Sequence, residues 1–300
     1  MTHNSSTKKL SLVLVITFLI FTGEVIGGFL SNSLALLSDA GHVFTDALAI
    51  LLSLIASIIS RRPSGSKATY GYQKIGILAA LINGVSLIII ALIIFIEGYR
   101  RFINPPSIDS YIMLPVAVFG FIGNLLMAKI LEHKHEDLNL KSAWLHVIGD
   151  TISSAAVIIS ALIIKFTGWL LVDPLASWLV GLIIIFGGIR VVKESLLIFL
   201  DFTPKGFNLD EIAHKIKNIK GVKSIHDIHI WSIGSGIYAF SSHVVVDVES
   251  LEEGDKIRME VEKQLKELGI KHTVIQIEKT PCENKNFFCE IENYRKHHLH

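Results

Sequence analysis

The sequence is poor in charged residues and in cysteine, and both shortages restrict what the protein can be. Charged residues make up 18% of the 300 residues, whereas an ordinary soluble domain carries about 25%. Two cysteines are present, Cys282 and Cys289, which is too few for a disulfide-stapled scaffold. The formal net charge is +1, so composition gives no sign of a nucleic-acid partner, and we expect none.

Two sequence patterns are also missing. The helix motif H-E-x-x-H does not occur, so an intramembrane zinc protease would lack its usual metal-binding helix. No small-residue cleavage site follows the first apolar run, which begins near Leu10. We therefore interpret that run as a retained anchor rather than a signal peptide. Because no clear general base or nucleophile accompanies the polar residues of the apolar runs, we do not expect an enzyme.

Long apolar runs fill the chain up to about residue 200. Hydrophobic residues make up 51% of the sequence, and a membrane span needs roughly 20 mostly apolar residues in a row. We predict an all-α, six-helix transmembrane domain over residues 1–202. Its spans cover about 10–30, 34–60, 75–98, 111–131, 142–164 and 172–200.

The polar part that follows is predicted to be a small α+β cytoplasmic domain over residues 203–281, ferredoxin-like, with the order αββαβ. Its helices show amphipathic periodicity, and its strands are β-branched with a period of two. Residues 282–300, which contain both cysteines and several histidines, are expected to form a flexible tail. The predicted helices cover about 208–219 and 251–268, and the strands 222–233, 237–248 and 272–279.

Lysines and arginines in the short loops predict the orientation in the membrane, because they are concentrated on the cytoplasmic side. Nine fall on one side and three on the other, which places both termini in the cytoplasm of a multi-pass membrane protein. The nine are Lys8, Lys9, Arg61, Arg62, Lys67, Lys74, Lys134, Lys141 and Lys193, and the three are Arg100, Arg101 and Lys165.

Two of the apolar spans contain the same pair of polar residues. His42 and Asp46 stand four apart in "HVFTD", and His146 and Asp150 stand four apart in "HVIGD". On a helix this spacing places both side chains on one face. One charge at the membrane centre costs at least about 2.5–3.5 kcal/mol, so a repeated pair needs a reason, either polar bonding between helices or metal binding.

Metal binding is the hypothesis we favour for this repeated pair. Two imidazoles and two carboxylates suit tetrahedral zinc, whereas magnesium and calcium prefer six or more oxygens. We therefore expect these four residues to bind a transported cation.

Other polar residues in the apolar spans are given structural roles. Asp39 is interpreted as a group at the start of its helix, in preference to an acceptor beside the metal site. Glu24, Asn83 and Asn124 are expected to form hydrogen bonds between helices. Gly27–Gly28 would let two helices approach closely.

Together these features resemble the cation diffusion facilitator family, and in particular its bacterial zinc-transporting branch. The resemblance covers almost the whole chain and rests on the six spans, the repeated His-x3-Asp, the "SLALLSDAGHVFTD" stretch, the "YGYQK" loop and the "HDIHIW" strand. It implies a homodimer that exports zinc in exchange for protons by alternating access. Histidine rather than aspartate in the second span resembles the zinc, cadmium and cobalt type.

The resemblance also implies a metal site in the cytoplasmic domain. Gln276 stands where some family members have a ligating histidine, which disfavours a site for two metals. His229, beside Trp231, is interpreted as structural. The implied ligands are His226, His243, His272 and Glu278.

The sequence departs from some family members in its loops. The loop "RRPSGSKATYGYQK" contains neither aspartate nor histidine, so no metal site is expected there. His133 and His135 are interpreted as part of a solvated loop rather than as ligands. By resemblance, Lys74 is expected to form an ion pair with Asp201.

The leading interpretation is a proton-coupled zinc exporter that also accepts cadmium or cobalt. Metal requires neutral histidine and ionised aspartate, so protons and metal compete for the same groups. The alternative is a membrane metal sensor whose cytoplasmic domain signals zinc without transport. A zinc flux assay distinguishes the two.

Overall fold

The structure is a computed structural model that describes residues 2–131, 138–281 and 287 of the chain. Within the helices, the side chains of residues 2–12, 14, 131 and 138–146 lie outside the described part. The chain forms two compact units. One contains residues 1–52 and 80–192, and the other contains residues 53–79 and 193–300.

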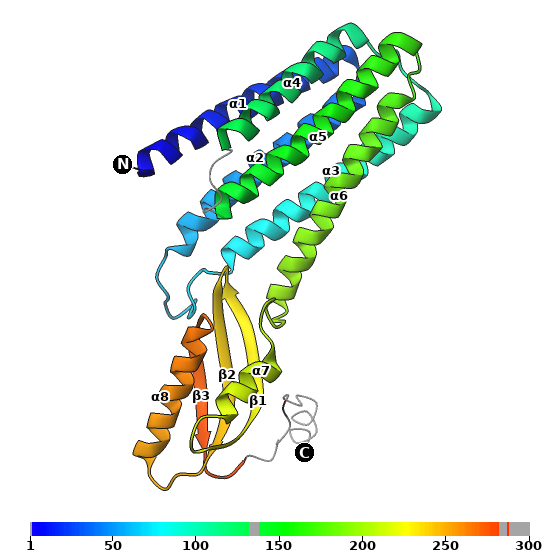
Figure 1. Ribbon diagram of the computed structural model, residues 1–300. Coiled ribbons are helices and arrows are strands. Elements are labelled where there is room, and N and C mark those ends of the chain that lie inside the picture. Colours follow the sequence, from blue (N-terminus) through cyan, green and yellow to red (C-terminus); the bar gives the residue numbers. More distant parts are fainter. Residues whose placement is uncertain (1, 132–137, 282–286, 288–300) are drawn as a thin grey trace. The chain divides into compact units, whose positions relative to one another are not determined.

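Six long helices come first along the chain (Figure 1). Among the described residues, five of them are long and apolar enough to cross a membrane, and the described apolar part of the remaining helix, Val15–Ser31, is shorter. The six predicted helices are therefore all present as helices. They are α1 (Thr2–Ser31), α2 (Leu34–Ser60), α3 (Ile75–Ile103), α4 (Ser110–Leu131), α5 (Leu138–Thr167) and α6 (Val172–Phe199).

Small residues let the helices of the first unit pack closely. A Cβ added at Gly27 of α1 would lie 2.6 Å from Val116 of α4, and one added at Gly28 would lie 2.7 Å from Leu37 of α2. Both distances are far below van der Waals contact, so only glycine fits at this packing. The close approach predicted from Gly27–Gly28 is confirmed, and α1 lies beside α4 (Figure 1).

A buried apolar cluster joins α2, α4 and α5. Leu36 of α2, Met113 of α4 and Val157 of α5 are each fully buried in it. Because α2 and α5 carry the repeated polar pair, this cluster fixes the two helices against a common neighbour. Within the first unit, α4 packs along α5 and α1, and Leu36 of α2 joins them in this cluster.

The second unit contains the predicted αββαβ domain. Its elements are α7 (Leu209–Lys217), β1 (Val222–Gly234), β2 (Ile237–Val246), α8 (Leu251–Glu267) and β3 (Ile270–Glu278). The sheet order is β1-β2-β3, with β1 antiparallel to β2 and β2 parallel to β3. The helix α8 connects the two parallel strands, as a crossover must.

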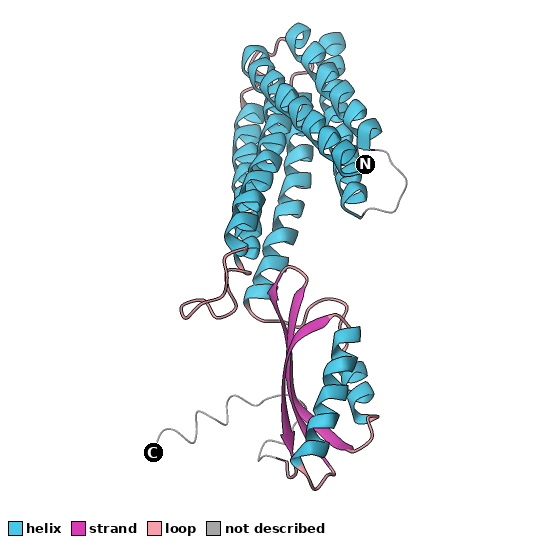
Figure 2. Ribbon diagram, turned by 90° about the vertical axis from the view of Figure 1, so that its left-hand side faces the viewer, coloured by secondary structure: helices cyan, strands magenta, loops and turns pink. Residues whose placement is uncertain are grey.

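Both helices of this domain cover the same face of the sheet (Figure 2). Ile216 of α7, Phe240 of β2 and Val261 of α8 belong to one buried core. Asn208 and Ser250 cap the first turns of α7 and α8 through their side-chain oxygens, as expected for these residue types.

Candidate functional site

Three of the four residues predicted for the transport site lie together in the first unit. One ligand atom from each of His42, Asp46 and Asp150 lies within 4.8 Å of the others. His42 Nε2 lies 3.3 Å from Asp150 Oδ1, which joins α2 to α5. Asp150 is buried, while His42 and Asp46 are partly buried.

The spacing of these residues on their helices explains why they lie together. His42 and Asp46 are one turn apart on α2, so they share a face. His146 and Asp150 have the same spacing on α5, but the side chain of His146 lies outside the described part of the structure. Its role as the fourth ligand stays a prediction.

Asp39 does not have the role predicted from the sequence. It is buried at 3% exposure, and α2 begins at Leu34, more than one turn earlier. Its Oδ1 accepts a hydrogen bond from the Ser153 hydroxyl at 2.5 Å, and its Oδ2 accepts one from Ser154 at 2.8 Å. Asp39 is thus an acceptor for two hydroxyls of α5 and not a group at the helix start.

The other polar residues of the spans agree in part with their predicted roles. Asn124 of α4 donates to Ser154 of α5 at 3.0 Å, which confirms a hydrogen bond between helices. Glu24 of α1 is 1% exposed, and its Oε1 lies 2.5 Å from where a Cβ of Gly120 would stand. Glycine at position 120 therefore leaves the space that this carboxyl group occupies.

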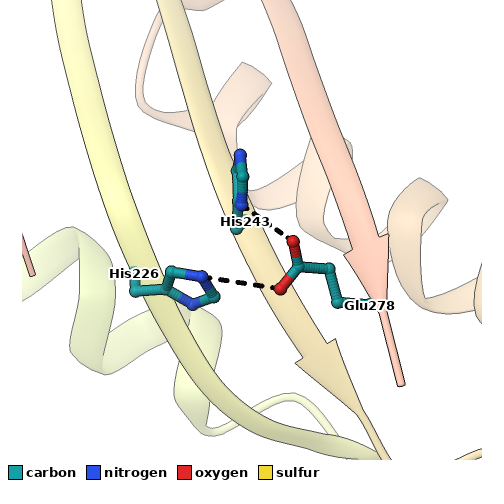
Figure 3. Close-up of side chains that lie close together, drawn as sticks. All are labelled: His226, His243 and Glu278. Carbon is teal, nitrogen blue, oxygen red and sulfur yellow. Dashed lines mark ion pairs between the residues drawn. The ribbon is translucent and has the colours of Figure 1, made fainter. Parts of the chain in front are cut away.

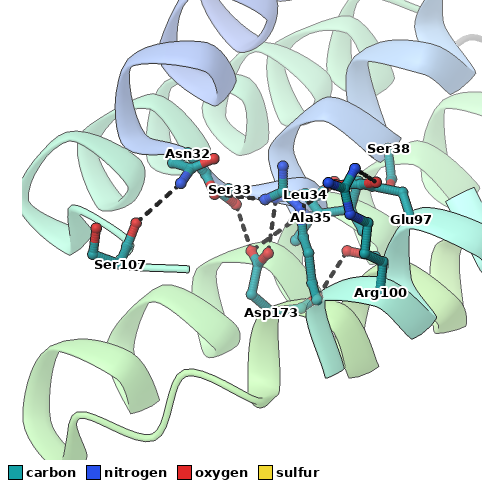
Figure 4. Close-up of polar contacts among 11 residues, drawn as sticks. Asn32, Ser33, Leu34, Ala35, Ser38, Glu97, Arg100, Ser107 and Asp173 are labelled. Atoms are coloured by element: carbon teal, nitrogen blue, oxygen red, sulfur yellow. Dashed lines mark hydrogen bonds and ion pairs between the residues drawn. The ribbon is translucent and has the colours of Figure 1, made fainter. Parts of the chain in front are cut away.

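A further acidic residue, Asp173, which the sequence interpretation did not single out, holds the start of α2. Asp173, in the first turn of α6, accepts hydrogen bonds from the Ser33 hydroxyl at 2.6 Å and from the Leu34 and Ala35 backbone N–H groups at 2.8 and 3.2 Å (Figure 4). The first N–H groups of a helix have no partner within it. Asp173 thus caps α2 from another helix.

A second set of candidate ligands lies in the cytoplasmic domain. His226 of β1 and His243 of β2 are paired in the sheet register, and both point toward Glu278 of β3 (Figure 3). His243 Nδ1 lies 2.8 Å from Glu278 Oε1, and His226 Nε2 lies 3.5 Å from Glu278 Oε2. One ligand atom from each of the three lies within 4.8 Å of the others.

His272 does not join this set within one chain. It pairs with Ala239 in the register of β2 and β3 and precedes Glu278 by six residues, a separation of about 20 Å along a strand. Its ring instead meets the ring of Tyr70 edge-on, with centroids 5.4 Å apart. The structure brings together three of the four implied ligands, and a ligand role for His272 stays a prediction.

Asp227 is a candidate that the sequence interpretation missed. Its backbone has a φ of 53°, and the register of β1 shifts between His226 and His229. This bulge turns the Asp227 carboxylate toward both neighbouring imidazoles, 3.1 Å from His229 Nε2 and 3.5 Å from His243 Nε2. A period-two strand pattern could not show this, because a bulge changes which face a residue occupies.

The predicted ion pair outside these sites is present. Lys74 Nζ lies 2.9 Å from Asp201 Oδ1, and both residues are in the second unit. His133, His135, Cys282 and Cys289 lie outside the described residues.

Comparison with known proteins places this arrangement in a family. Residues 10–200 match the family described as "Cation efflux transmembrane domain", and residues 204–280 match "Cation efflux protein, cytoplasmic domain". The chain belongs to the cation efflux family. Its members are transporters, and the chain is therefore a multi-pass membrane protein.

Curated relatives align over nearly the full length. The chain is 40% identical to the "Cadmium, cobalt and zinc/H(+)-K(+) antiporter" of Bacillus subtilis (strain 168), over 100% of both chains. It is 40% identical to the "Metal cation efflux system protein CzcD" of Cupriavidus metallidurans, over 93% of this chain and 88% of that one. It is 35% identical to the "Zinc transporter ZitB" of Escherichia coli (strain K12), over 92% and 88%.

Membership in the cation efflux family agrees with the geometry. The transmembrane match contains the His42, Asp46 and Asp150 group, and the cytoplasmic match contains the His226, His243 and Glu278 group. The resemblance stated from the sequence is confirmed.

Proposed function

We propose that the protein exports zinc, and also cadmium and cobalt, from the cytoplasm in exchange for protons. The observation that carries this proposal is the meeting of His42 and Asp46 on α2 with Asp150 on α5. The relatives named above are described as a zinc, cadmium and cobalt antiporter with H(+) and K(+), a metal cation efflux protein and a zinc transporter. His146, one turn from Asp150, completes the proposed set of four.

The donor set suits this cargo. Zinc accepts nitrogen and oxygen ligands in a tetrahedral arrangement, and two imidazoles with two carboxylates provide four such donors. His42 must be neutral and both aspartates ionised to bind metal, so protons compete directly for the ligand atoms. When the site faces the side richer in protons, protonation releases the metal, and when it faces cytoplasmic zinc, metal displaces the protons.

We also propose that both termini lie in the cytoplasm and that the protein works as a homodimer. The loop charges counted above support the orientation, and the family of the cytoplasmic domain supports the dimer. His226, His243 and Glu278 would hold a zinc ion in this domain, since they supply two nitrogens and a carboxylate. Such a site would respond to cytoplasmic zinc.

Zinc flux into sealed proteoliposomes with an imposed pH gradient tests the proposal. The wild type is expected to move zinc faster when the gradient is present, because protons exchange for the metal. Asp46→Ala and Asp150→Ala are expected to reduce flux by at least a hundredfold, because each removes an anionic ligand that histidine cannot replace. Asp247→Ala, at an exposed residue of the cytoplasmic domain, is the matched control and is expected to transport normally.

The metal-sensor alternative predicts a different result. A sensor would bind zinc in detergent but show no zinc flux in the wild type under any gradient. Near-normal flux in Asp46→Ala or Asp150→Ala would instead reject the proposed ligand set while leaving transport established.

A further inference from the structure

The Asp39 carboxylate makes a two-point contact between the helices that carry the transport site. Ser153 and Ser154 are adjacent on α5, and each donates its hydroxyl to a different oxygen of Asp39, at 2.5 and 2.8 Å. A bidentate contact fixes both the distance between two helices and their relative position along the axis. A single hydrogen bond would leave one of these free.

This contact is buried and is extended to a third helix. Asp39 and Ser153 are each 3% exposed, and Ser154 is 1% exposed. Asn124 of α4 donates to the Ser154 oxygen at 3.0 Å, so the Ser154 hydroxyl is oriented toward Asp39. All three side chains are buried, so water does not compete for these hydrogen bonds.

The contact lies one helical turn from the candidate ligands on both helices. Asp39 precedes His42 by three residues on α2, and Asp150 precedes Ser153 by three residues on α5. Residues three apart on a helix are neighbours on its surface. A change in the spacing of α2 and α5 at Asp39 is therefore transmitted to the 3.3 Å approach of His42 Nε2 and Asp150 Oδ1.

We propose that Asp39 is a positioning residue that sets the size of the transport site, and thereby its preference for zinc over the larger cadmium ion. The inference rests on the proposed function and adds a specificity determinant to it. Zinc bonds to nitrogen and oxygen are short, about 2.0–2.2 Å, so zinc requires the two helices to be held close. Cadmium tolerates a wider site.

Asp39→Asn tests this role with little change in size. An amide has one acceptor oxygen, so only one of the two serine hydroxyls keeps its partner, and the helices lose one point of the contact. We expect the KM for zinc to rise about tenfold, as for the loss of other supporting groups around a metal site. The KM for cadmium should change less than twofold, and Vmax for both should stay within twofold of the wild type.

A second variant changes the residues of α5 that form the contact. Ser153→Ala with Ser154→Ala removes both donors and should shift the zinc-to-cadmium KM ratio in the same direction. Combining all three changes should add nothing to the double serine variant, because that variant already removes both hydrogen bonds of the contact. Ser160→Ala is the matched control, since Ser160 is a fully buried serine on the same helix whose hydroxyl makes no hydrogen bond among the described residues.

The measurements are zinc and cadmium uptake by proteoliposomes, together with zinc binding to each purified full-length variant. If either Asp39→Asn or the double serine variant keeps the wild-type KM ratio, the inference is wrong. If Asp39→Asn does not fold, the serine variant decides alone. A wild-type protein that transports neither metal would reject the proposed function. That result differs from an unchanged KM ratio in the variants, which would reject only the inference about Asp39.

Discussion

His243 lies between two carboxylates, and each of its ring nitrogens faces one of them. Nδ1 faces Glu278 at 2.8 Å and Nε2 faces Asp227 at 3.5 Å. Imidazoles that bind metal through one nitrogen usually donate their other N–H to a carboxylate, which fixes the tautomer and the ring orientation. With metal beside Glu278, Asp227 is suitably placed to be that acceptor.

Replacing Asp227 should therefore weaken the cytoplasmic site without removing it. Asp227→Asn is expected to lower zinc affinity about tenfold and to leave the number of bound zinc ions unchanged. Calorimetry on the full-length protein that also carries Asp46→Ala isolates this site from the transport site. Asp247→Asn is the control at an exposed aspartate, and equal affinities in the two variants would show that Asp227 has no such role.

For single residues, the sequence predicted contacts within one helix better than contacts between distant segments. The repeated His-x3-Asp predicted that His42, Asp46 and Asp150 lie together, because a helix places residues four apart on one face. Asp39 was assigned incorrectly because its partners, Ser153 and Ser154, are more than 110 residues away. No local pattern indicates such a contact, and serine on a helix is usually unremarkable.

Among the elements, the packing of α1 against α4 depends on the absence of a side chain. Gly27→Ala would place a methyl group 2.6 Å from Val116, and overpacking of this kind costs about 1–3 kcal/mol. We expect a lower thermal transition for the purified protein. Gly187→Ala on α6 is the matched control, because a Cβ there meets nothing within 4 Å. An unchanged transition in Gly27→Ala would show that α1 shifts freely on α4.

The order and type of the elements were predictable, whereas their registers were not. Hydrophobic runs and alternation are local signals, and they correctly gave six helices followed by αββαβ. The bulge at Asp227 depends on how β1 and β2 pair, and pairing register is set by contacts between segments. His272 and Glu278 instead stand six residues apart on one strand, about 20 Å, so three and not four of the implied ligands meet within one chain, and the spacing in the sequence already implied this separation.

For the whole molecule, the two proposed metal sites predict separate roles for bound zinc. The proposed transport site would move the ion, and the proposed cytoplasmic site would respond to the cytoplasmic zinc concentration. A bound ion can favour one conformation only through its higher affinity for that conformation. His243→Ala is therefore expected to lower zinc flux severalfold at limiting zinc and to leave flux at saturating zinc within twofold of the wild type.

Flux measured across a range of zinc concentrations checks this expectation, with Lys263→Ala, at a solvent-facing residue of α8, as the control. A proportional loss at every concentration would mean that His243 supports folding or dimerisation rather than a response to zinc. Calorimetry on the same protein shows whether the transport site still binds.

The contact of Asp173 with the start of α2 has a consequence for how the chain is made. Ser33 and Asp173 are 140 residues apart, and at about 5–20 residues per second the ribosome delivers the acceptor on the order of ten seconds after the donors. Until then the Leu34 and Ala35 N–H groups lack the carboxylate that they bond in the finished protein. In nascent chains interrupted before α6, the first N–H groups of the second span therefore lack the acceptor that caps them in the complete protein.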